Sequence, residues 1–232
     1  MNETLISAFY AVSFFFSLFL IGFLWWLAYR YPAGRRLWGW LAAGWSVNTL
    51  SSLIWGLYVM LVSEDIPGLV DNLYVLRYVF VLLALWLYPA AWPWRRWAGI
   101  LAAMLVAALV LWFGFVQPLQ KISSQPFDYI LAGTIFPLLD AGMLYAAWAR
   151  WRDTTDQPVN TVMALIALSS LAYGIANWVN YRARAVVPDA NPPVALIGWL
   201  LTDVFAALAG WWFVRQTQQQ IQSSSASSGE RP

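Results

Sequence analysis

Apolar residues along this chain gather in seven long runs that short polar segments separate. Each run is close to the 20 or so residues that cross about 30 Å of hydrocarbon as an α-helix. Backbone groups in lipid must bond within their own segment, so such runs predict membrane-spanning helices. The predicted spans are 6–29, 38–62, 72–91, 97–116, 127–149, 159–181 and 193–214. The sequence therefore predicts an all-α, polytopic protein with a seven-helix domain over 1–215 and a disordered cytoplasmic tail over 216–232.

The composition agrees with this fold class and narrows the chemistry. Hydrophobic residues make up 61% of the chain and charged residues only 10%, against roughly 25% in soluble domains. The absence of Cys and His removes thiol nucleophiles, imidazole bases and the commonest zinc and haem ligands. Lys121, the one lysine, falls in a loop, which excludes a retinal Schiff base. We expect no catalytic site, no metal and no cofactor.

The basic residues predict an orientation, because cytoplasmic loops of membrane proteins carry the excess of arginine and lysine. The ends of the odd-numbered spans hold eight arginines, and the opposite ends hold three basic residues. The first group comprises Arg30, Arg35, Arg36, Arg95, Arg96, Arg150, Arg152 and Arg215; the second comprises Lys121, Arg182 and Arg184. We therefore expect a bacterial inner (plasma) membrane location with the N-terminus outside and the C-terminus in the cytoplasm.

Two segments of the chain are similar to two later segments. Residues 50–57 (LSSLIWGL) match 168–175 (LSSLAYGI) at five of eight positions, and 74–80 (YVLRYVF) resemble 199–205 (WLLTDVF). Both matches skip four spans, which preserves direction across the membrane. The pattern predicts a parallel 3+1+3 repeat with the fourth span as connector. Coincidence among abundant membrane residues is the alternative.

Three ionisable residues lie well inside the predicted spans: Arg77, Asp140 and Asp203. Each costs about 2.5–3.5 kcal/mol at a helix centre, so partners should lie near. We predict that Arg77 and Asp203, with Asn48 and Asn177, form a polar cluster that binds a small ligand or a lipid headgroup, with Asp140 as a further member. The alternative is a structural cluster that holds the helices together.

Residues 41–44 (LAAG), 51–58 (SSLIWGLY) and 71–78 (DNLYVLRY) together resemble a known family. They are similar to the seven-helix membrane sensory regions that precede diguanylate cyclase or histidine kinase domains in bacterial signalling proteins. The resemblance extends over nearly the whole chain and implies a receptor-like bundle. Since 17 residues follow Arg215, we expect the sensory region without its output domain.

Three classes of function remain. The first is a non-enzymatic receptor-like or scaffold protein that binds other membrane subunits, lipid or a hydrophobic ligand; 17 tryptophans, more than interfacial belts require, favour it. The second is a small-solute transporter, which the 3+1+3 repeat suggests by its likeness to PQ-loop sugar transporters. The third is a sensor with a bound pigment or ligand. Nothing in the composition points to nucleic acid.

The predicted orientation can be tested with a reporter fused to the C-terminus. Because the arginine excess places that end inside, a reporter that works only in the cytoplasm should be active and one that works only outside should be silent. The opposite activities would reverse the assignment.

Overall fold

The computed structural model describes residues 3–62, 69–120, 122, 133–187, 190 and 192–228. Within these ranges every regular element is helical, which confirms the all-α prediction. Lys121, Asp128 and most of the two loops that follow α2 and α5 lie outside the described residues. The elements are α1 (Glu3–Arg30), η1 (Pro32–Gly34), α2 (Arg35–Val62), α3 (Leu69–Leu87), α4 (Arg96–Leu111), η2 (Trp112–Val116), α5 (Gln117–Leu119), α7 (Ile135–Asp153), α8 (Gln157–Val186) and α9 (Pro193–Ser228).

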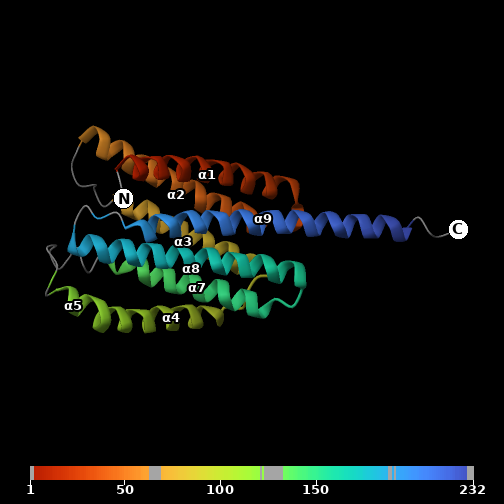
Figure 1. Ribbon diagram of the computed structural model, residues 1–232. Helices are drawn as coiled ribbons and strands as arrows, with labels where there is room; N and C mark the ends of the chain where they lie inside the picture. The colour runs from red at the N-terminus through yellow and green to blue at the C-terminus, as the bar shows by residue number, and fades with distance from the viewer. Residues whose placement is uncertain are drawn as a thin grey trace.

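The long helices run side by side along one common direction (Figure 1). Six of them contact one another in the order α1, α2, α3, α7, α8 and α9, and α9 returns to contact α1. α4 packs mainly against α7, outside this ring. The ring thus consists of two three-helix units, α1–α2–α3 and α7–α8–α9, and in each unit the middle helix contacts the other two. The two units meet where α3 contacts α7 and where α9 contacts α1.

Small residues let these helices approach closely, which is how helices associate without a hydrophobic drive between them. Gly198 of α9 lies against α8, where an added Cβ would be 2.8 Å from the Cβ of Ala176 and 3.1 Å from the Ala172 carbonyl oxygen. Gly44 of α2 faces α3 less tightly, because an added Cβ would be 3.5 Å from the Arg77 carbonyl oxygen, an ordinary van der Waals distance. Buried alanines continue this packing at Ala42, Ala84, Ala146, Ala147, Ala206 and Ala209.

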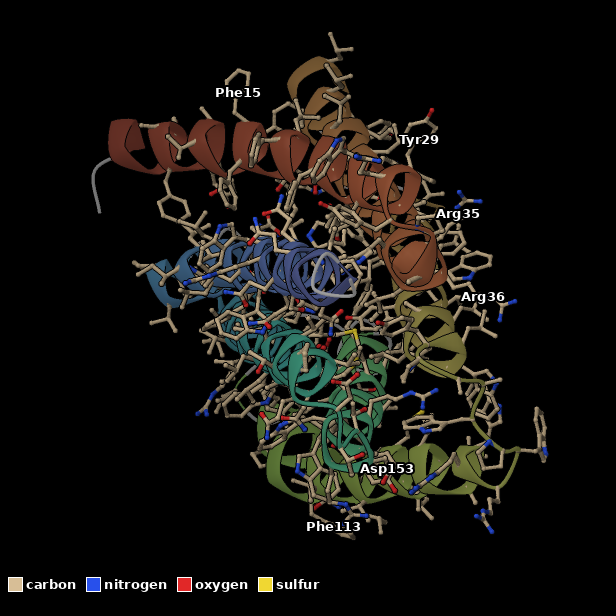
Figure 2. All side chains as sticks on the ribbon, turned by 90° about the vertical axis from the view of Figure 1, so that its right-hand side faces the viewer. Phe15, Tyr29, Arg35, Arg36, Phe113 and Asp153 are labelled. Carbon is tan, nitrogen blue, oxygen red and sulfur yellow. The ribbon has the colours of Figure 1, made fainter. Side chains whose placement is uncertain are left out.

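The outer surface of the bundle is apolar. Phe15 on α1 is 69% exposed and Phe113 beyond α4 is 64% exposed, and both point away from the bundle (Figure 2). Within the described residues, four helices are long and apolar enough to cross a membrane: Ser7–Arg30, Arg96–Leu119, Gln157–Val186 and Pro193–Ser223. A shorter apolar helix covers Leu73–Leu87. These helices and the apolar surface indicate that the chain resides in a membrane.

α3 ends four residues before the predicted limit of its span, 72–91. Its last residue is Leu87, and Pro89 follows Tyr88. A proline cannot donate to the helix ladder and disfavours helical backbone in the residue before it, so the helix stops there although the sequence remains apolar.

Arg150 secures this end of α3. Although its position in the sequence suggested an exposed topogenic charge, its side chain is only 5% exposed. Nε donates to the Leu85 carbonyl at 2.5 Å, and Nη2 donates to the carbonyls of Trp86 at 2.8 Å and Ala90 at 2.5 Å. A cation at the C-terminal end of a helix satisfies carbonyls that have no partner within the helix and complements its dipole. Arg150 therefore fastens α7 to α3.

α9 departs most from the sequence prediction. Residues 216–228, expected to be a disordered tail, form its last turns, and the helix extends past the bundle at the end where the C-terminus lies (Figure 1). Glutamine is a fair helix former, and extending an existing helix avoids the cost of nucleation. The prediction treated this segment in isolation and so omitted the helix that precedes it. Residues 229–232 lie outside the described range.

The close contact between α8 and α9 predicts that Gly198→Val destabilises the bundle. The added side chain must force α9 away from Ala172 and Ala176, at a cost of about 1–3 kcal/mol. Gly56→Val is the matched control, because nothing lies within 4 Å of an added Cβ there. Denaturation by SDS from a mild detergent would compare them, and equal losses for both variants would contradict the packing.

Candidate functional site

The interior of the ring contains a network of polar and aromatic side chains to which all six ring helices contribute. We call it the polar centre. It comprises Ser17 of α1, Trp45 and Asn48 of α2, Arg77 and Tyr78 of α3, Asp140 of α7, Tyr173 and Asn177 of α8, and Trp199 and Asp203 of α9. It includes all five residues that the sequence analysis selected.

Arg77 is 2% exposed and lies between two aromatic rings. Its guanidinium carbon is 3.6 Å from the centroid of the Tyr173 ring and 4.5 Å from that of Trp45. A desolvated cation over a ring gains about 2 kcal/mol or more, and a planar guanidinium can stack on both faces. Aromatic rings thus provide much of the stabilisation that a buried cation needs.

Asn48 holds this arrangement in register. Its Oδ1 accepts hydrogen bonds from Arg77 Nη1 at 3.1 Å and from the Tyr173 hydroxyl at 3.1 Å. One amide oxygen therefore joins α2, α3 and α8. Arg77 Nε is buried and has no hydrogen-bond partner among the described residues, so this N–H donor is unused.

Asp140 is held by neutral donors. Oδ1 accepts the Tyr78 hydroxyl at 2.8 Å, and Oδ2 accepts Asn177 Nδ2 at 3.1 Å. Asn177 in turn accepts the indole N–H of Trp199 at 2.9 Å. These bonds connect α3, α7, α8 and α9 around one carboxyl group.

Gly174, the glycine of the repeated motif in α8, makes room for Asp140. A Cβ at Gly174 would lie 3.3 Å from the Asp140 Cβ. The matching glycine in α2, Gly56, has open space around it. The repeated motif therefore contributes to the polar centre in α8 but not in α2.

Asp203 is the second buried carboxyl group, at 8% exposure. Its Oδ2 accepts the Ser17 hydroxyl at 2.5 Å and its Oδ1 accepts the Trp45 indole N–H at 2.7 Å. These bonds tie α9 to α1 and α2, where the two three-helix units meet.

Arg77 and Asp203 belong to the same centre but form no direct ion pair. The ion pair found among the described residues is Arg96 with Asp153. Trp45 connects the two instead, with its ring face under Arg77 and its N–H on Asp203. The charge of Arg77 acts electrostatically on both Asp140 and Asp203, so one cation is shared by two carboxyl groups.

The sequence analysis missed Ser17, Trp45, Tyr78, Tyr173 and Trp199. Two signals were present: Tyr78 is adjacent to Arg77, and Tyr173 belongs to the repeated motif. Carboxylates and amides were the predicted partners of the buried charges, whereas the partners in the structure are largely aromatic rings, hydroxyls and indoles. In a site with few charges, aromatic donors take the place that ions occupy in soluble proteins.

Fold and site together define a helical bundle with membrane-crossing helices and a buried polar centre. The described residues contain no group of three or more acidic side chains, histidines or cysteines suited to a metal ion. Comparisons with protein families, curated proteins and solved structures find no match to this chain.

The bridging role of Trp45 predicts coupling between Trp45→Phe and Asp203→Ala. Phenylalanine retains a ring for Arg77 but has no N–H, and alanine has no acceptor, so each variant deletes the hydrogen bond between the two residues. Their stability losses should fall short of additivity by about 0.6–1.7 kcal/mol. The control cycle uses Trp211→Phe with Asp203→Ala. Trp211 is 51% exposed on the same helix, and its cycle should be additive. Equal coupling in both cycles would refute the bridge.

Proposed function

We propose that this chain is a non-enzymatic membrane protein of the receptor-like kind, in which all seven long helices cross the bilayer with the N-terminus outside and the C-terminus in the cytoplasm. α2, α3 and α7 pack among the four helices that are long and apolar enough to cross a membrane, and along the same direction (Figure 1). At 19 to 28 residues they reach about 28–42 Å, enough for about 30 Å of hydrocarbon.

One observation supports the receptor-like role most strongly: α9 belongs to both the polar centre and the segment that leaves the bundle. Asp203 ties α9 to α1 and α2, and the same helix continues without interruption to Ser228. From Asp203 to Ser223 is 20 residues, about 30 Å of helix. A tilt of about 5° at Asp203 would therefore move Ser223 by roughly 3 Å.

The polar centre is suited to respond to a bound molecule or a partner. Its carboxyl groups share one cation, and Arg77 Nε has an unused donor. A hydrophobic ligand, a lipid or a second membrane subunit that changes the separation of the two three-helix units would alter the bonds of Asp203. The change would reach the cytoplasm through α9, which fits the resemblance to membrane sensory regions.

This role predicts that α9 changes its orientation when its ties to α1 and α2 are removed. The chain has no native cysteine, so spin labels at Thr155→Cys, in the turn between α7 and α8, and Ser223→Cys report one distance. Electron–electron dipolar spectroscopy should give one main distance in the parent. Ser17→Ala and Asp203→Ala, which remove the hydroxyl donor and the carboxyl acceptor, should each shift or broaden it.

Trp211→Phe, on α9 but outside the polar centre, serves as the control and should leave the distance unchanged. An unchanged distance in Ser17→Ala and Asp203→Ala, with folding intact, would contradict the proposal. It would leave the centre as a structural cluster.

A small-solute transporter is the second candidate, favoured by the helix packing. The two three-helix units have the same order of neighbours and α4 stands outside them, as the predicted 3+1+3 repeat requires. In this alternative the polar centre, between the two units, is the solute site. Uptake into liposomes by the purified chain that Arg77→Met abolishes would favour transport over signalling.

A further inference from the structure

A second polar site lies apart from the polar centre, at the end of the bundle that carries Arg35, Arg36 and Asp153 (Figure 2). It is an open hollow of about 340 Å³ between α4 and α7, lined by Arg95, Arg96, Gly99 and Tyr145. Small-molecule sites are typically about 300–1,000 Å³ and combine apolar walls with a few converging polar groups. The hydroxyl of Tyr145 lies directly over Gly99, where a Cβ would have no room.

The hollow has an excess of positive charge. Arg96 is paired with Asp153, whereas Arg95 is exposed and forms no ion pair among the described residues. Arg150 is close enough for Arg96 to repel its charge, and its donors are bound to the carbonyls at the end of α3. Two guanidinium groups therefore line the hollow, and the one carboxylate in the described part of the chain that forms an ion pair with either of them is Asp153. The first turn of α4 adds the positive end of a helix dipole and contains no acidic residue.

An apolar stripe leads away from this charge along α4. Ala98, Ala102, Leu105 and Leu109 are spaced by three or four residues from Arg95 and therefore continue on one face of the helix. Leu105 is 63% exposed and Leu109 is 54% exposed. The stripe is therefore exposed, and it begins at Arg95, which also lines the hollow.

We propose that the hollow binds the headgroup phosphate of an anionic phospholipid, with an acyl chain lying along the exposed stripe of α4. A soluble anion would need only positive charge, whereas this protein offers the positive charge of the hollow and, next to it, the exposed apolar stripe of α4. Arg95 is the main contact and has no competing carboxylate. Arg96, already paired, and the Tyr145 hydroxyl complete the donors around the phosphate.

The test uses the full chain purified in mild detergent and depleted of lipid. Thermal unfolding is followed while phosphatidylglycerol, or phosphatidylcholine with the same acyl chains, is added. Phosphatidylglycerol should stabilise the chain at lower concentration than phosphatidylcholine. Arg95→Gln should weaken its apparent affinity about fivefold, the effect expected of one arginine near an anionic lipid. Tyr145→Phe should also weaken it, and this variant keeps the ring packing.

Arg36→Gln is the matched control, because Arg36 is an exposed arginine at the same end of the bundle but outside the hollow (Figure 2). It should leave the affinity for phosphatidylglycerol unchanged. Equal losses for Arg36→Gln and Arg95→Gln would show diffuse charge attraction and overturn the site. Equal stabilisation by the two lipids, or full stabilisation by inorganic phosphate alone, would overturn the lipid assignment.

The inference rests on the membrane location in the proposed function but not on the role of the polar centre. If the protein dissolved in buffer without detergent, the membrane location would be contradicted before any lipid was added. If it needed detergent but showed no preference for phosphatidylglycerol, only the proposed headgroup site would be contradicted.

Discussion

The bundle must accommodate the guanidinium of Arg77, because a cation at membrane depth costs about 2.5–3.5 kcal/mol or more without partners. Two aromatic faces and the amide oxygen of Asn48 provide those partners. They come from α2 and α8, so the cation can be stabilised only when the first and second three-helix units are together. The requirement to satisfy one charge thus links helices that are far apart in the sequence.

The two carboxyl groups extend the same constraint to the rest of the ring. Asp140 gathers donors from α3 and α8, and Asp203 gathers donors from α1 and α2. All of these donors are uncharged, so the network depends on geometry more than on ion pairing. Small displacements of a helix therefore break bonds that no neighbouring charge can replace. Such a centre holds the bundle in one arrangement and makes it sensitive to whatever moves the two units apart.

The membrane-facing features were largely predictable, because they follow from composition and spacing. Apolar runs located the long helices to within a few residues at most ends, and the selection of Arg77, Asp140 and Asp203 needed only their isolation among apolar residues. The helical end of α9 was not predictable from the polarity of 216–228 alone, since its helicity depends on the helix that precedes it. The early end of α3 was signalled by Pro89, which the prediction passed over.

The class of the protein follows from the amino-acid sequence alone: an apolar helical chain with few charges, whose buried ions require partners. The identity of those partners follows from how the helices pack. Trp45 bridges Arg77 to Asp203, and the buried side chain of Arg150 binds the carbonyls at the end of α3. Local sequence specifies how far a helix runs and which residues lie on one face. Which face meets which neighbour depends on packing between segments that are, in two of the contacts above, 62 and 158 residues apart, and no periodicity within one helix contains that information.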